Sequence, residues 1–219
     1  MRKFETLVSI AAPYNESDVD TDAIFPARFL LLLNRAGLGK HLFNDLRTPP
    51  NAKDPFVLDR PDFKQAQILV VGERFGIGSS REHAVWAMSD VGIRCVIARS
   101  FGDIFRANCF KNGVLPIALD TAQHMRVLAA ANRGKPLTVD LETKLIKLSA
   151  GSDIAFDVPD QQRRALMLGQ DEIGAILDED ADTIAAFEAQ QKQIMPWLSV
   201  SPEPLSSFYP THPSKDAEP

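Results

Sequence analysis

Short apolar runs alternate with amphipathic segments through the middle of the chain. Three of these runs are rich in β-branched residues and are bounded by glycine or charge, which is typical of buried strands. They lie at residues 68–71, 95–98 and 114–119. The segments between the runs have helical character, so the order is strand, helix, strand, helix, strand. This order predicts a mostly parallel sheet built with right-handed crossovers, and therefore an α/β fold.

The helices of this core are expected at residues 80–91, 101–111 and 121–132. In the third of them, Thr121 is the expected N-cap, and Met125 and Leu128 fall on one face. A fourth helix is expected at residues 29–35. Gly37 and Gly39 follow it and are suited to ending a helix.

The pattern changes after Gly134. Apolar and polar residues alternate with period two in two neighbouring segments, which predicts an antiparallel hairpin. These segments lie at residues 137–141 and 145–148. Further elements are expected as a strand at residues 5–10 and as helices at residues 160–168 and 180–195.

The composition is that of a globular protein. The chain has 219 residues, of which 45% are hydrophobic and 24% charged, with a net charge of −5. We expect one domain over residues 1–198, including a C-terminal helical extension. Residues 199–219 contain five prolines and are expected to form a flexible tail. No basic stripe of the kind that nucleic-acid binding requires is present in the sequence.

The length of the apolar runs bears on membrane insertion, and the number of cysteines bears on metal binding. No apolar run approaches the roughly 20 residues of a membrane-spanning helix. The N-terminus places Glu5 before any apolar core, so it makes a poor signal peptide, and a cytoplasmic location is expected. Only two cysteines occur, Cys95 and Cys109. Two thiols cannot by themselves hold an iron–sulfur cluster or a cysteine-rich zinc site.

The segment with the most chemical content follows the first buried run. Gly76 and Gly78 permit unusual backbone dihedrals and leave room for a ligand. Ser79, Ser80 and Arg81 come next, at the expected start of a helix. Free N–H groups, the positive end of the helix dipole and a guanidinium together suit a small carboxylate or phosphate.

A structural interpretation of the same residues stays open. Ser79 with Glu82 three residues later has the spacing of a capping box, which stabilises a helix without any ligand. Three familiar motifs do not match. A dinucleotide-binding loop needs a third glycine where Arg81 stands, a Walker loop needs Gly-Lys-Ser/Thr, and a hydrolase elbow needs glycine in place of Glu82.

Three ordered motifs resemble the aconitase swivel-domain superfamily. The first is Phe-Gly-Ile-Gly-Ser-Ser-Arg-Glu-His-Ala at residues 75–84, and the second is the segment from Asp18 to Leu30. The third comprises residues 99–108 followed by Gly-Val-Leu-Pro at residues 113–116. Residues 37–46 resemble the longer bacterial form of the isopropylmalate isomerase small subunit. Ile77 departs from the many relatives that have cysteine there, and the proline-rich tail has no counterpart in the family pattern.

The resemblance implies a fold and a reaction. The fold would be a swivel-type β/β/α domain with a mostly parallel central sheet, a C-terminal hairpin and further helices. The enzyme would be a hydro-lyase that interconverts 2-isopropylmalate and 3-isopropylmalate through isopropylmaleate, in leucine biosynthesis. It would work as a heterodimer or higher hetero-oligomer, in which a large subunit holds the 4Fe-4S cluster.

The resemblance also implies roles for individual residues. Ser79 matches the catalytic base, while Ser80 and Arg81 match positions that bind a substrate carboxylate beside Gly76 and Gly78. The triplet Asp20-Thr21-Asp22 would line the same cleft, although a turn that caps the next segment explains it as well. His83 lies one helical turn after Ser79, and helix packing is the favoured interpretation for it.

Substrate choice is predicted from Leu31. In relatives that resemble homoaconitase, an arginine at this position pairs with an additional carboxylate. A leucine there favours an alkyl group, which gains about 0.8 kcal/mol per buried CH₂. The competing interpretation is that Leu31 belongs to the buried face of a helix. Two other functions stay open, a paralogous dehydratase of citraconate or methylmalate type and a non-catalytic scaffold.

Overall fold

The computed structural model describes residues 1–32, 34–47, 54–78 and 80–198. It divides into one unit from Met1 to Glu172 and a second that begins at Ile173. The structure therefore does not describe Ser79 or the segment 199–219, for which a tail is predicted. The proposed domain from residue 1 to residue 198 stays a prediction.

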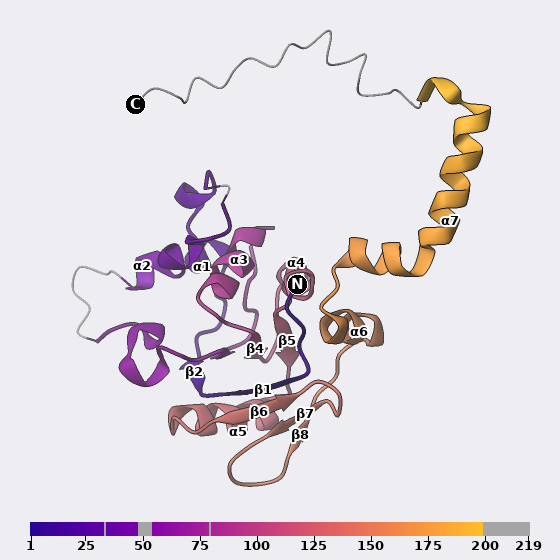
Figure 1. Ribbon diagram of the computed structural model, residues 1–219. Helices are drawn as coiled ribbons and strands as arrows, with labels where there is room; N and C mark the ends of the chain where they lie inside the picture. Colours follow the sequence, from indigo (N-terminus) through magenta and orange to yellow (C-terminus); the bar gives the residue numbers. More distant parts are fainter. Residues whose placement is uncertain (33, 48–53, 79, 199–219) are drawn as a thin grey trace, which may run out of the picture. The chain divides into compact units, whose positions relative to one another are not determined.

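A parallel sheet forms the centre of the first unit (Figure 1). Its strands follow chain order, β2-β3-β4-β5, and all pairs are parallel. They are β2 (Ala11–Tyr14), β3 (Ile68–Val71), β4 (Cys95–Ala98) and β5 (Leu115–Ala118). The three predicted buried strands are thus confirmed. Sequential strands in one order place the crossover helices α3 (Glu82–Asp90) and α4 (Asp103–Lys111) on the same face.

An antiparallel sheet lies below the parallel one in Figure 1. Its order is β1-β6-β7-β8. The strands are β1 (Thr6–Ser9), β6 (Leu137–Asp140), β7 (Leu145–Lys147) and β8 (Ile154–Ala155). The predicted hairpin is β6–β7, and β8 adds a strand that was not predicted. The strand predicted at residues 5–10 is confirmed as β1, which ends at Ser9. Strand β2, which enters the other sheet at Ala11, was not predicted.

Alternation along the buried strands separates two hydrophobic clusters. Leu69 and Val71 face a cluster with α3 and α4, whereas Ile68 and Val70 face a cluster with helix α5 (Thr121–Asn132) and the antiparallel sheet. Strands β3 and β4 are buried on both faces, which explains their continuous apolar sequence. The remaining short helices of this unit are α1 (Thr21–Ile24), α2 (Asn44–Arg47) and α6 (Asp160–Leu168).

Helix α5 differs in detail from the sequence prediction. Its N-cap is Asp120, whose Oδ1 accepts a hydrogen bond from the Gln123 N–H at 2.8 Å, so the assignment of Thr121 as the cap is wrong. Its buried face includes His124 and Val127, while Met125 is 63% exposed. A carboxylate accepts more strongly than a hydroxyl at a helix start, and Asp120 precedes Thr121 directly.

His124 fastens α5 to the carboxyl end of β3. Its Nε2 lies 2.6 Å from the Val71 carbonyl oxygen, and since a carbonyl can only accept, Nε2 carries the proton. Burial lowers the pKa of His124, so the ring is neutral at physiological pH.

The predicted helix at residues 29–35 is wrong. The structure has a 3₁₀ turn at Ala27–Phe29, and the described residues that follow, 30–32 and 34–35, belong to no helix. Leu31 is 90% exposed. The interpretation of Leu31 as part of a buried helix face is therefore excluded. Gly37 adopts a left-handed conformation and begins, rather than ends, a short helical turn, Leu38–His41.

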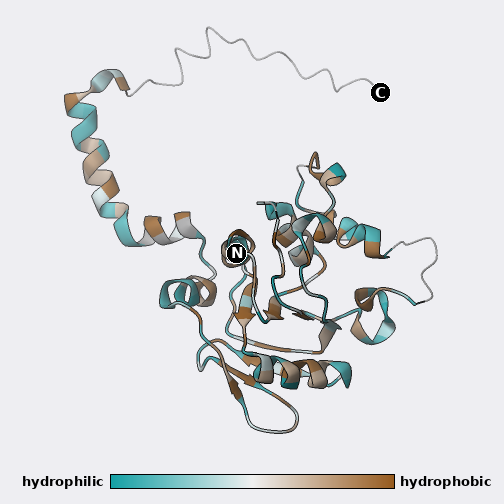
Figure 2. Cartoon of the chain, turned by 180° about the vertical axis from the view of Figure 1, so that it is seen from behind, coloured by the Kyte–Doolittle hydropathy of each residue, from teal (hydrophilic) through white to brown (hydrophobic). Residues whose placement is uncertain are grey.

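The second unit contains helix α7 (Glu172–Ile194), which begins well before the predicted residue 180, followed by a turn at Pro196–Leu198. Apolar and polar residues alternate along it (Figure 2). Several of its apolar side chains are exposed, among them Ile176 and Phe187. In the described part of the chain, no helix is long and apolar enough to cross a bilayer.

The cap of α5 gives a test of this fold. We expect Asp120→Ala to lower the free energy of unfolding by about 1 kcal/mol, because the Gln123 N–H loses its acceptor. The matched control is Thr121→Ala, which is expected to stay within about 0.5 kcal/mol of the parent. Urea denaturation monitored by circular dichroism measures both. A larger effect at Thr121 than at Asp120 would contradict the observed cap.

Candidate active site at the carboxyl ends of the parallel strands

The loops that follow β2, β3 and β4 stay hydrogen-bonded to one another beyond the strands. The Asp18 N–H donates to the Glu73 carbonyl at 2.9 Å, and the Phe75 N–H donates to the Ser100 carbonyl at 3.1 Å. Two ion pairs join the same loops, Arg74 with Asp18 and Arg99 with Glu73. The edge where ligands bind in parallel α/β sheets is therefore well ordered here.

Two glycines shape the loop after β3. Gly76 has φ +76°, and a Cβ on it would lie 2.2 Å from Cγ of Phe105 in α4. Gly78 has φ +96°, and a Cβ on it would lie 3.3 Å from Cβ of Asp20. Both residues therefore need glycine for their backbone conformation, and Gly76 also needs it for packing. The expectation that both glycines adopt unusual backbone dihedrals is confirmed, while their part in ligand binding stays a prediction.

The predicted anion-binding residues come directly after these glycines. Ser79 lies outside the described residues, so its role stays a prediction. Ser80 is exposed, and Arg81 is the N-cap of α3, which begins at Glu82 rather than at residue 80. The capping-box interpretation does not hold, because the N-cap of α3 is Arg81 and the Glu82 carboxylate accepts hydrogen bonds from Asn112 and Trp86.

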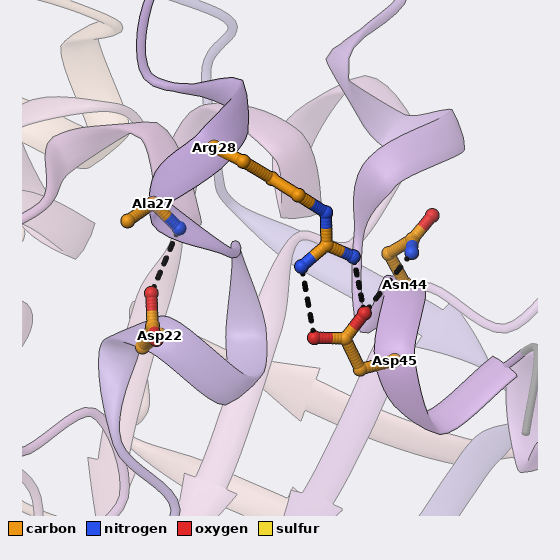
Figure 3. A network of polar contacts seen from close by, with 5 residues as sticks. All are labelled: Asp22, Ala27, Arg28, Asn44 and Asp45. Carbon is orange, nitrogen blue, oxygen red and sulfur yellow. Dashed lines mark hydrogen bonds and ion pairs between the residues drawn. The ribbon is translucent and has the colours of Figure 1, made fainter.

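Arg81 is paired with a residue of the second predicted motif. Its Nη1 donates to Oδ1 of Asp22. The same oxygen accepts a hydrogen bond from the Ala27 N–H at 2.8 Å, and Figure 3 shows this second bond. The Ala27 N–H, followed by Arg81, lowers the pKa of Asp22, so this carboxylate is charged at neutral pH. The Arg81 side chain is 19% exposed and that of Asp22 is 55% exposed. Water, and hence a ligand, has access to the pair.

The other two residues of the triplet are used differently. Asp20 caps α1, with Oδ1 accepting from the Ala23 N–H at 2.7 Å. Thr21 is buried, and its N–H donates to the Ile77 carbonyl at 2.9 Å. The capping interpretation therefore holds for Asp20, and Asp22 is the member of the triplet in contact with Arg81.

A second polar network borders this region and was not predicted. Arg28 pairs with Asp45 through both terminal nitrogens, and Asn44 donates to the same carboxylate at 3.2 Å (Figure 3). Hydrogen bonds from Arg28 and Asn44 lower the pKa of Asp45. Together with the bond from Ala27 to Asp22, this pair fixes the turn that leads into the exposed Leu31. No sequence spacing indicates a pair separated by 17 residues.

His83 packs as predicted. Its ring stacks on Phe25, with centroids 5.8 Å apart, and lies against Trp86 with centroids 4.6 Å apart. These two ring contacts agree with a packing role for His83 on α3.

The two cysteines do not fit an iron–sulfur cluster. Cys95 lies in the hydrophobic cluster that includes α5, and Cys109 lies in the cluster of α3 and α4. Both are fully buried, and burial raises the pKa of each thiol, which opposes the thiolate form that a cluster needs. Among the described residues, no group of three or more histidine, cysteine or acidic side chains is arranged to hold a metal ion.

Comparisons with known proteins agree on one family. A family model described as the aconitase C-terminal domain matches residues 1–122, and another, described as the C-terminal domain of the 3-isopropylmalate dehydratase small subunit, matches residues 177–200. Proteins named 3-isopropylmalate dehydratase small subunit from Paramagnetospirillum magneticum and Dinoroseobacter shibae are 49% and 48% identical to the chain. Each comparison covers 90% of this chain and 100% of the relative.

A solved structure supports the same family. The crystal structure titled 3-isopropylmalate dehydratase from Methanocaldococcus jannaschii matches with a TM-score of 0.61 and 26% identity. The match covers 83% of this chain and 99% of that one.

The packing of Gly76 on α4 can be tested by adding one methyl group. We expect Gly76→Ala to destabilise the chain by about 2–4 kcal/mol, because left-handed strain adds to the clash with Phe105. Gly37→Ala is the matched control, since Gly37 also has a positive φ but a Cβ on it would meet nothing within 4 Å. It is expected to cost about 1 kcal/mol. Equal losses in urea denaturation would refute the close contact with α4.

Proposed function

Because the chain belongs to the family of 3-isopropylmalate dehydratase small subunits, we propose that it isomerises 2-isopropylmalate and 3-isopropylmalate together with a large subunit. The reaction removes a proton and a hydroxyl from neighbouring carbons to form isopropylmaleate and returns both with their positions exchanged. The proposal depends on one observation, which is that Asp22 holds Arg81 at the start of α3. In the sequence, Arg81 closely follows the glycines and Ser79.

Arg81 is proposed to bind a carboxylate of the substrate. A guanidinium has five N–H donors in a planar fork that matches a carboxylate, and Asp22 contacts one terminal nitrogen of Arg81. Asp22 is itself held by the Ala27 N–H, so it sets the direction of the guanidinium before the substrate arrives. Such preorganisation lowers the cost of ordering the site in the transition state.

Ser79 is proposed as the base that takes the proton from the carbon next to a carboxylate. A serine hydroxyl is a weak base at its ordinary pKa, so it needs groups that stabilise its deprotonated form. The backbone N–H groups at the start of α3 and the positive charge of Arg81 would both stabilise the negative charge of the Ser79 alkoxide. Ser80 is proposed to donate its hydroxyl to the same substrate carboxylate.

We infer that the 4Fe-4S cluster of the enzyme is held by the large subunit. The family is that of an aconitase-type dehydratase, and the buried positions of Cys95 and Cys109 do not suit cluster ligands. The chain would then provide carboxylate recognition and proton transfer, and the partner subunit would complete the site. A cytoplasmic location remains our expectation for this enzyme.

The base assignment is tested in the complex reconstituted with the large subunit. We expect Ser79→Ala to lower kcat for isopropylmalate by at least about 10³-fold, since alanine cannot accept the proton and the neighbouring Ser80 is assigned to the substrate carboxylate. Ser79→Cys, which keeps an ionisable group, should retain more activity than Ser79→Ala. Equal turnover in the parent and in Ser79→Ala would defeat the assignment and would favour a scaffold role for this chain.

Substrate choice is tested at the exposed loop. We expect Leu31→Arg to lower kcat/KM for isopropylmalate by about tenfold or more, because an apolar contact with the isopropyl group is replaced by a charge. Leu168→Arg, at another exposed leucine, serves as the control. A panel with isopropylmalate, citraconate and dimethylmalate then separates the paralogous functions. If isopropylmalate were the poorest substrate of the parent enzyme, the assignment to leucine biosynthesis would be lost.

A further inference from the structure

Glu82 joins the start of α3 to the end of α4. Its Oε1 accepts hydrogen bonds from Nδ2 of Asn112 at 2.8 Å and from Nε1 of Trp86 at 3.3 Å. All three side chains are partly buried. The sequence predicted Glu82 only as a helix cap, and neither the proposed carboxylate site nor the proposed base uses it.

Asn112 is fully engaged by this network. Its Nδ2 donates both to Glu82 and to the Asn108 carbonyl at 2.9 Å, and its Oδ1 accepts from Nε1 of Trp86 at 3.0 Å. The opposite orientation of the amide would place an oxygen against two acceptors, so the contacts determine the orientation. Asn112 is also the C-cap of α4, where its backbone N–H bonds to carbonyls of the last turn.

The network lies at the start of α3, where the side chain of the N-cap residue makes no capping hydrogen bond. The N-cap is Arg81, whose guanidinium cannot accept a hydrogen bond and therefore makes no capping interaction. Glu82 is the next residue, so its bond to Asn112 restrains the turn from which Arg81 projects towards Asp22. The Arg35 guanidinium lies over the Trp86 ring, with its Cζ 4.3 Å from the ring centre.

The same helix, α4, also supports the other end of the site segment. Gly76 packs against Phe105 of α4, and Glu82 bonds to Asn112 at the C-cap of α4. The segment between Gly76 and Glu82 holds the proposed base and carboxylate-binding residues. It is therefore attached to α4 at both of its ends.

We infer that Glu82 is a positioning residue for the isomerase reaction, which acts through Asn112 to hold Arg81 in the geometry that binds the substrate carboxylate. The inference depends on the proposed function of Arg81. Displacements of about 1 Å in such a site can change rates by about 10²-fold, so a loosened first turn of α3 should be visible in kinetics.

The test uses the full chain reconstituted with the large subunit and isopropylmalate as the substrate. Glu82→Ala is expected to raise KM by about tenfold or more with a smaller change in kcat, because carboxylate binding is the step that depends on Arg81. Glu82→Gln keeps an oxygen that accepts from Asn112 and is expected to stay within about threefold of the parent. Glu142→Ala, in the exposed turn between β6 and β7, is the remote control.

Exchanging the acid and the amide between residues 82 and 112 separates a positioning effect on KM from a general loss of stability. Asn112→Asp places two carboxylates against each other and should raise KM as Glu82→Ala does. The double variant Glu82→Gln with Asn112→Asp restores a donor and an acceptor between residues 82 and 112 but not the bond to the Asn108 carbonyl, so KM should fall below that of Asn112→Asp. This comparison also decides the question if Glu82→Ala does not assemble.

Two results would overturn the role of Glu82. One is an assembled Glu82→Ala enzyme with the KM and kcat of the parent, and the other is a double variant whose KM is no better than that of Asn112→Asp. Both are judged against an active parent complex. A parent complex that does not turn over isopropylmalate would instead count against the proposed function.

Discussion

Everything at the candidate site depends on loops that keep the order of the parallel sheet after its strands have ended. The Gly76 N–H bonds to the Val19 carbonyl at 2.8 Å, and the Gly102 N–H bonds to the Phe75 carbonyl at 2.9 Å. The loop after β3 therefore lies between those that follow β2 and β4, as the strands themselves do. Backbone hydrogen bonds do much of the work of placing these loops, which leaves other side chains of the loops available to bind and react.

Close packing between these loops and α4 also determines where α3 begins. Gly102 allows its chain to approach the carbonyl of Gly76, since a Cβ there would lie 2.5 Å from that oxygen. Gly76 in turn rests on Phe105. The start of α3 is thus set by contacts with α4 and with the loop after β2, and Arg81 meets Asp22 from a separate part of the chain.

Local patterns predicted the centre of the fold and failed where tertiary contacts decide. Strands β3 and β4 are fully buried and β5 is buried except at Ala118, and the continuous apolar sequences of all three are typical of a strand in the core. Strand β2, with the sequence Ala-Ala-Pro-Tyr, was missed because alanine and proline disfavour strands. It pairs only with β3 and is thus an edge strand, where the missing N–H of Pro13 is tolerated.

The same distinction applies to the site. The glycines and Arg81 were recognisable because their chemistry lies within a few consecutive residues. The pairs Arg81–Asp22, Arg28–Asp45 and Glu82–Asn112 join segments separated by 59, 17 and 30 residues, and spacing contains no information about them. The leucine run misled the prediction for the opposite reason. Four adjacent leucines have high helix propensity, but the structure has only a 3₁₀ turn before Leu31 is exposed.

The exposure of the site bears on why such a chain would need a second subunit. Asp22 and Leu31 are 55% and 90% exposed in this chain, and an ion pair in contact with water contributes little to binding. The same charges act much more strongly once water is excluded. A serine base has the same requirement, because its deprotonated form must be stabilised by oriented N–H groups rather than by mobile water. A large subunit that closes over the carboxyl ends of the strands would supply that exclusion, and would cover the exposed leucine in the same step.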